Sequence, residues 1–191
     1  MAKKSLLAKF LIWRMKHISQ RQFVLVLSAV VGLVSGLAAV TLKNAVHYIK
    51  QLLTSSFISD FNYLYFAYPV IGILITILFM KYILKQQVGH GIPAVLYAIS
   101  KKNSIMKRHN MFSSMIASTL TVGFGGSAGL EGPTVATGSS IGSNIGRTLH
   151  LNYKTITLLL GCGAAGAMAG IFNAPIAAIV FALEVIMLDL T

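Results

Sequence analysis

Three long apolar runs without a single charged residue most constrain how this chain can fold. They cover residues 23–42, 61–80 and 155–183. The apolar core of a bilayer is about 30 Å thick, and a helix of about 20 residues crosses it. Only 10% of the residues are charged, and the mean hydropathy of +0.76 is unlike that of a soluble domain. The sequence therefore predicts an all-α polytopic membrane protein.

The basic residues predict the orientation of the chain in its membrane. The net charge is +12, with Lys and Arg gathered near the N-terminus and again over residues 81–108, while residues 52–62 carry none. Cytoplasmic loops of membrane proteins hold the excess of basic residues. We expect a multi-pass protein of the inner membrane with a cytoplasmic N-terminus. Nucleic-acid binding is excluded, because the basic residues flank apolar segments instead of lining one solvent-facing stripe.

Residues 1–21 mix lysines with large apolar side chains and predict an amphipathic helix on the cytoplasmic face of the membrane. A signal peptide is the competing interpretation. The apolar run that follows is longer than the 7–15 residues or so of a signal-peptide core, so we interpret it as a retained span. Residues 22–191 then form one transmembrane domain.

The stretch over residues 123–146 is crowded with glycine and serine, and it holds Glu131, one of four acidic residues in the chain. We expect Pro133 at the first position of a helix, where proline loses no needed N–H. The N-terminus of a helix carries about half a positive charge and free N–H groups, which together bind anions. The stretch therefore predicts an anion site beside a carboxylate.

A second glycine-rich helix start lies at GHGIP, residues 89–93, where Gly89 and Gly91 flank His90. We expect a short helix from there to Lys101, too short to cross a membrane. Broken helices at membrane depth are tolerated where they line a cavity or are buried in protein, and transporters use them to direct helix N-termini at anionic substrates.

Other glycines recur at a spacing that favours close helix packing. Gly138, Gly142 and Gly146 follow every four residues, and Gly32 and Gly36 form a GxxxG pair. The pattern GxGxxG also occurs at residues 161–166, but a dinucleotide site needs a preceding strand, and we assign this pattern to helix packing. At IFNAP, residues 171–175, Asn173 and Pro175 predict the end of one helix and the start of another.

Three stretches together, GHGIP at 89–93, GSAGLEGPTV at 126–135 and FNAPIAAIVFALE at 172–184, strongly resemble the CLC family of chloride channels and chloride/proton antiporters. The resemblance implies a fold of inverted helical repeats, a homodimer with one pore per subunit, chloride as the transported ion, and no cofactor. It implies that Glu131 is the gating glutamate. The anion-binding residues that it implies are Gly89, His90, Gly91, Ile92, Pro93, Gly129, Leu130, Gly132 and Pro133.

The chain departs from the family pattern at three of its positions. His90 stands where a serine is common, so it either donates an N–H to the anion or faces elsewhere while the backbone binds. Leu130 replaces an arginine before the gating glutamate. Antiporters often carry two adjacent glutamates on the last helix, but here Glu184 is followed by Val185, which cannot carry a proton. The missing acid favours a channel or an uncoupled transporter over a tightly coupled antiporter.

The resemblance also implies a second, inverted half of the fold. We therefore expect these 191 residues to be the first half of a CLC-like domain, which inserts in a membrane but does not conduct by itself. The alternatives are a half-size protein that pairs with itself, a membrane scaffold that needs a partner chain, and a fluoride- or nitrate-selective relative. An enzyme is not expected, since no spaced acid orients His90 as a base for Ser127 or Ser139. The sequence has no repeated His/Cys spacing that predicts a metal site.

Overall fold

The computed structural model of the chain describes residues 19–55, 64–84 and 91–187. The amphipathic helix predicted over 1–21 falls almost wholly outside the described residues, and so do Gly89 and His90.

Every regular element of the described residues is helical, as predicted. In chain order they are α2 (Gln20–Ser55), α3 (Leu64–Leu78), η1 (Phe79–Leu84), α4 (Gly91–Lys101), α5 (Asn110–Gly123), α6 (Glu131–Thr148), α7 (Tyr153–Phe172), α8 (Pro175–Phe181) and η2 (Ala182–Ile186). The segments η1 and η2 are π-helical continuations of α3 and α8. The short helix predicted to end at Lys101 is α4.

Three helices in the described part of the chain are long and apolar enough to cross a membrane, at Gln20–Leu53, Ala67–Leu84 and Tyr153–Phe172. They contain most of the three uncharged runs. The third run is divided at Asn173, as predicted. Asn173 ends α7 with a φ of 55°, a left-handed conformation that asparagine tolerates better than most residues, and Pro175 begins α8.

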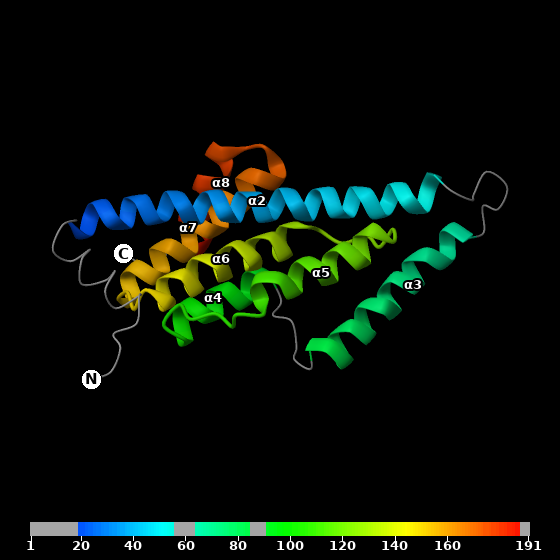
Figure 1. Cartoon of the computed structure of the whole chain (residues 1–191), viewed down its shortest axis with the longest axis horizontal. Coiled ribbons are helices and arrows are strands. Elements are labelled where there is room, and N and C mark those ends of the chain that lie inside the picture. Colours follow the sequence, from blue (N-terminus) through cyan, green and yellow to red (C-terminus); the bar gives the residue numbers. More distant parts are fainter. Residues whose placement is uncertain (1–18, 56–63, 85–90, 188–191) are drawn as a thin grey trace, which may run out of the picture.

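The core of the molecule is a glycine seam in which α2 and α6 both pack on α7 (Figure 1). A Cβ atom added at Gly138 would overlap the carbonyl of Gly163, and one at Gly142 would overlap another carbonyl of α7. A Cβ at Gly166 would overlap the carbonyl of Gly32 on α2. The predicted small-residue faces on α2 and α6 are therefore confirmed, and α7 is the helix that both of them contact.

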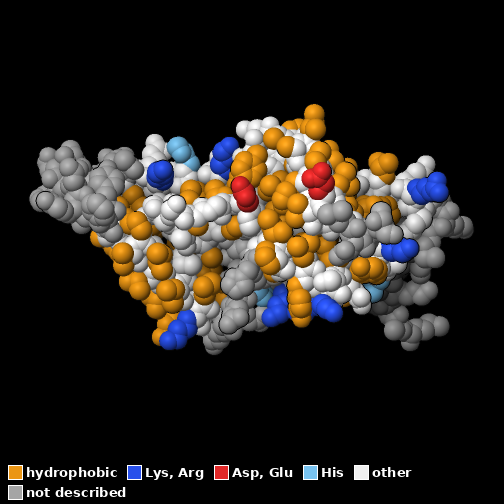
Figure 2. Space-filling model, turned by 180° about the vertical axis from the view of Figure 1, so that it is seen from behind, with side chains coloured by type: hydrophobic (Ala, Val, Ile, Leu, Met, Phe, Trp, Pro, Cys, Tyr) orange, Lys and Arg blue, Asp and Glu red, His pale blue; other side chains and the backbone are white. Residues whose placement is uncertain are grey.

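The 161–166 glycine pattern lies inside α7 and contributes to this seam. Outside the seam, the surface is apolar. Leu25 and Leu33 on α2 are each 70% exposed, and α3 exposes a similar row of aliphatic side chains. Figure 2 shows hydrophobic side chains across the face seen from behind. Such a surface suits the interior of a bilayer.

Candidate anion site at two helix N-termini

The structure brings the two predicted glycine-rich helix starts together. Gly91 is the first residue of α4, and Glu131 is the first residue of α6. A Cβ atom on Gly91 would lie 2.9 Å from the Cα of Gly132 and 3.3 Å from its carbonyl carbon. In return, a Cβ on Gly132 would lie 3.5 Å from the Cα of Gly91. The two backbones touch at the start of their helices.

Gly91 is required here for two separate reasons. Its φ of +55° lies in the left-handed region, a backbone conformation that residues with a Cβ atom rarely adopt. Its missing side chain also leaves the room that the backbone of Gly132 occupies. Any other residue would strain the start of α4 and move it away from α6.

At the start of each of the two helices, the first N–H groups have no carbonyl within the helix to which they can donate a hydrogen bond. In α6 the first bond of the helix runs from the N–H of Thr134 to the carbonyl of Leu130, at 3.0 Å. The N–H groups of Glu131 and Gly132 precede that bond and have no acceptor within the helix. At the start of α4, the N–H groups of Gly91 and Ile92 likewise have no acceptor within their own helix. Two positive helix ends with up to four N–H donors thus lie side by side.

The prediction for Pro133 was wrong by two positions. Pro133 is the third residue of α6, because Glu131 and Gly132 already have helical backbone. Proline is tolerated throughout the first turn, where its missing N–H breaks no helical hydrogen bond. Pro93 holds the same third position in α4. Both helices therefore present two N–H groups followed by a proline.

Glu131 stands at the positive end of α6, with an exposed side chain. Among the described residues its carboxylate has neither a hydrogen bond nor an ion pair. Leu130, just before it, is partly buried and packs on a cluster from α2 and α7 that contains Leu42 and Ile171. Leu130 thereby anchors the start of α6 to the α2 and α7 helices of the glycine seam.

The loop that leads into α6 leaves the helix start open. Ser127, Ala128 and Gly129 are exposed, and no atom lies within 4 Å of the place where a Cβ of Gly129 would stand. Gly125, with a φ of +91°, turns the chain after α5. The loop therefore approaches the site without covering it.

Glu184 and Val185 face different surroundings in η2. Glu184 is exposed, while Val185 packs on a core cluster that includes Val95 of α4 and Leu160 of α7. Figure 2 shows acidic side chains on a largely apolar face. Val185, which stands where the resemblance implies a second acid, is thus a partly buried apolar residue that packs against the core.

Sequence reasoning singled out the glycines of α6, considered Ser139 only as a nucleophile, and did not single out Ser143. Ser143 is fully buried and hydrogen-bonded to the loop after α4. The feature of the sequence that could have indicated Ser143 is its position on the buried side of a glycine-rich helix. Ser139 is equally buried, but its hydroxyl has no partner. Among the described residues, no group of three His, Cys, Asp or Glu side chains could hold a metal ion.

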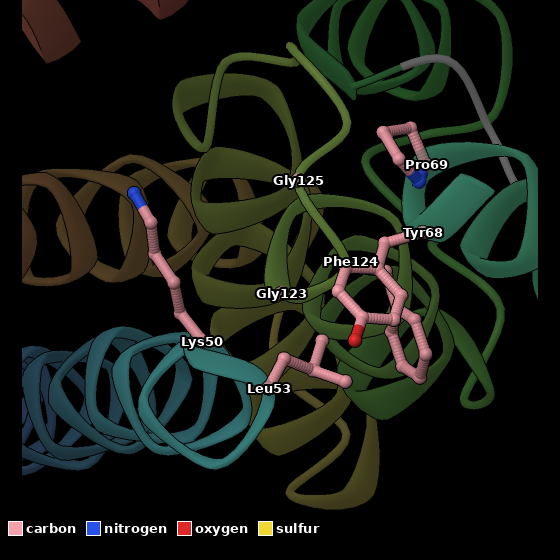
Figure 3. A pocket seen from close by; sticks show the side chains of 7 residues that line it. All are labelled: Lys50, Leu53, Tyr68, Pro69, Gly123, Phe124 and Gly125. Atoms are coloured by element: carbon pink, nitrogen blue, oxygen red, sulfur yellow. The ribbon is translucent and has the colours of Figure 1, made fainter. Parts of the chain in front are cut away.

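A separate cavity of about 210 Å³ lies between the ends of α2, α3 and α5 (Figure 3). Its walls include Lys50, Leu53, Tyr68 and Phe124. In Figure 3 the side chain of Leu53 lies beside the aromatic rings, and the Lys50 ammonium points away from them. None of the predicted anion-binding residues lines this cavity.

Comparison with known proteins decides the family. The family described as Voltage gated chloride channel matches residues 71–191, which is more than half of the chain. The chain belongs to this family. The match covers both helix starts and the segment that ends with Glu184 and Val185.

Several curated bacterial proteins are similar to the chain, and each is named H(+)/Cl(-) exchange transporter ClcA. The protein of Citrobacter koseri is 31% identical over 172 residues, and that of Vibrio cholerae serotype O1 is 32% identical over 170 residues. The protein of Salmonella arizonae is 29% identical over 172 residues. Each match covers 84% of this chain but only 36% of the relative's length. The family membership and the apolar helices together make this a multi-pass membrane protein of CLC type.

Proposed function

We propose that the chain forms part of a chloride transport pathway, in which the starts of α4 and α6 bind the anion together. The observation that carries the proposal is the backbone contact between Gly91 and Gly132. The contact supports the proposal because it brings together the starts of two helices, each with N–H groups that have no acceptor within the helix and that can bind a small anion. The family match and the names of the relatives support chloride as the ion, with fluoride or nitrate as alternatives that a selectivity series tests.

Glu131 is proposed to compete with the anion for these N–H groups. A carboxylate at a helix N-terminus is favoured by the same dipole that favours chloride. The Glu131 side chain is exposed and has no partner among the described residues, so no contact there holds it away from the anion. When the carboxylate occupies the site it closes the pathway, and when it is protonated it leaves the site to chloride.

Chloride efflux tests this proposal when it is measured from liposomes that contain the pore-complete protein, in which these residues are joined by the complementary half. We expect efflux to increase as the pH falls, and Glu131→Gln to remove most of that dependence, because the amide carries no charge at any pH. A Glu131→Gln protein with the pH response of wild type would refute the assignment. Absence of chloride efflux from the wild-type protein would refute the function itself.

Exchange of chloride for protons is favoured by the names of the relatives, while one structural observation opposes tight coupling. Val185 has no titratable group and packs against the core, so it cannot pass a proton inward. We propose that proton coupling is weak. A fixed proton counterflow in vesicles that survives Glu184→Gln would contradict this proposal.

The orientation with a cytoplasmic N-terminus is also proposed, from the asymmetry of the lysines. Cysteines placed at Lys4 and Ser56 should differ when intact cells are treated with an impermeant thiol reagent. Labelling at Ser56 alone supports the orientation, and labelling at Lys4 alone refutes it. The inner-membrane location, the homodimer and a complementary second half remain predictions from the resemblance.

A further inference from the structure

The loop after α4 is attached to α6 and α7 by buried polar contacts. Ser104 is fully buried, and its hydroxyl lies 2.6 Å from the hydroxyl of Thr157 on α7. Thr157 donates to the carbonyl of Tyr153, so the hydroxyl of Ser104 donates to Thr157. Met106 is 3% exposed, with its side chain in the core cluster below α4.

Ser143 of α6 is the centre of this attachment. Its hydroxyl donates to the carbonyl of Ser104 at 2.6 Å and accepts from the N–H of Met106 at 2.9 Å. The next residue, Asn144, donates from Nδ2 to the carbonyl of Met106 at 3.4 Å. One serine side chain thus satisfies both a buried acceptor and a buried donor of the loop, on a helix whose start lies at the anion site.

The same pair of helices is therefore connected at both ends. Gly91 meets Gly132 at the start of α4, and the loop that follows Lys101 is bonded to Ser143. Between these ends the contacts are apolar and come from Val95, Ala98 and Ile99 of α4. Apolar contacts have no preferred direction and let a short helix slide, whereas hydrogen bonds fix both distance and angle.

The backbone of the loop also depends on these bonds. Asn103 and Ser104 have φ values of 48° and 59°, in the left-handed region that is unfavourable for most residues with a Cβ. Two such residues in succession keep this conformation only when their surroundings hold it. The contacts of Ser104 with Thr157 and Ser143 supply that support.

We propose that Ser143 is a positioning residue for chloride, because it fixes α4 along α6 so that Gly91 stays against Gly132. Ser143 does not touch the ion. It acts through α4, which has 11 residues and is about 16 Å long, so a shift of the attached end moves the other end by the same amount. The inference rests on the proposed function of the two helix starts.

The test compares Ser143→Ala with Ser139→Ala in the native protein, with chloride flux measured over a range of chloride concentrations. Both serines are fully buried on α6, but only Ser143 has hydrogen-bond partners. We expect Ser143→Ala to raise the chloride concentration for half-maximal flux about tenfold, with a smaller change in maximal flux, because a displaced donor pair weakens binding. Ser139→Ala should leave both values as in wild type.

A merely structural role would lower the amount of active protein and hence maximal flux, with no change in half-saturation. That result, or equal effects of the two substitutions, overturns the proposal. If Ser143→Ala does not fold, Ser143→Cys gives the answer. A thiol is a weaker donor and acceptor than a hydroxyl, so this variant should raise the half-saturation concentration in the same direction.

Amide hydrogen exchange separates this inference from the function on which it rests. Ser143→Ala should speed exchange both in the loop over residues 103–106 and in the first turn of α4, whereas Ser139→Ala should change neither. Faster exchange in the loop alone overturns the positioning role even if chloride flux is intact. Failure of wild type to carry chloride refutes the proposed function, and the exchange pattern still decides whether Ser143 holds α4 in place.

Discussion

Along α6 and α7, glycines lie so close to neighbouring carbonyls that an added Cβ atom would overlap them, whereas Gly129, just before α6, has open space where its Cβ would stand. In the glycine seam the missing side chain brings two helices together. In the loop before α6, an added Cβ atom would lie in open space. A close-packed seam and an exposed first turn therefore share one helix, because the seam holds α6 while Glu131 at its start is exposed.

The largest effect is expected in the seam, from Gly142→Ala. The new methyl group would overlap a backbone carbonyl of α7, and backbone yields only by moving a whole helix. We expect a loss of about 3 kcal/mol in the free energy of unfolding. Unfolding in sodium dodecyl sulfate, followed by circular dichroism, measures it. Gly129→Ala is the matched control and should be within about 0.5 kcal/mol of wild type. Equal stability of the two variants would show that the seam is not close-packed.

Gly91→Ala applies the same chemical change to the site instead of the seam. It forces a Cβ into the left-handed region and against Gly132, so the start of α4 must move away. A displacement near 1 Å costs up to about a hundredfold in function that depends on geometry. Chloride efflux at low chloride concentration should fall by about that factor, while the Ser139→Ala protein transports as wild type does. Unchanged efflux in Gly91→Ala would show that transport does not depend on the contact between Gly91 and Gly132.

Leu130→Ala probes the point where the two regions join. The Leu130 side chain is only partly buried, against the cluster that contains Leu42 and Ile171, so its truncation should cost about 1–2 kcal/mol of stability. The pH response of chloride efflux should also change, since the first turn of α6 loses its anchor. Denaturant unfolding and efflux on the same preparation measure both. A change in stability with an unaltered pH response would show that Leu130 stabilises the packing of α6 but does not affect chloride efflux.

The smallest effect concerns His109, next to α5 and away from both regions. Burial, with the nearby Lys107 charge as a second cause, lowers the pKa of His109 below 6.5. Below pH 6.5 the unfolded chain binds more protons than the folded one, so the protein loses stability as the pH falls from 6.5 toward the lower pKa of His109 in the folded state. The melting temperature should fall by about one or two degrees more in wild type than in His109→Gln between pH 7 and pH 5. Identical pH profiles would show that His109 titrates normally.

The sequence predicted the helices, the break at Asn173 and the small-residue faces, because uncharged apolar runs, glycine and proline act locally. It also singled out both helix starts. That Gly91 and Gly132 touch could not be derived from local pattern alone, since the contact depends on how α4 packs on α6. The start of α6 was placed two residues late, because Pro133 is acceptable anywhere in the first turn. The role of Ser143 depends on the path of a loop distant in sequence, and no local pattern reports that path.

The most direct measurement is the position of bromide, a heavier substitute for chloride, located by anomalous X-ray scattering in crystals of the native protein. The central claim is that the starts of α4 and α6 bind the anion jointly. It predicts bromide within hydrogen-bonding distance of backbone N–H groups from both helices, beside the Gly91–Gly132 contact, and loss of that bromide in Gly91→Ala. Bromide bound by only one of the two helices, or only in the cavity beside Lys50 and Tyr68, would contradict the claim.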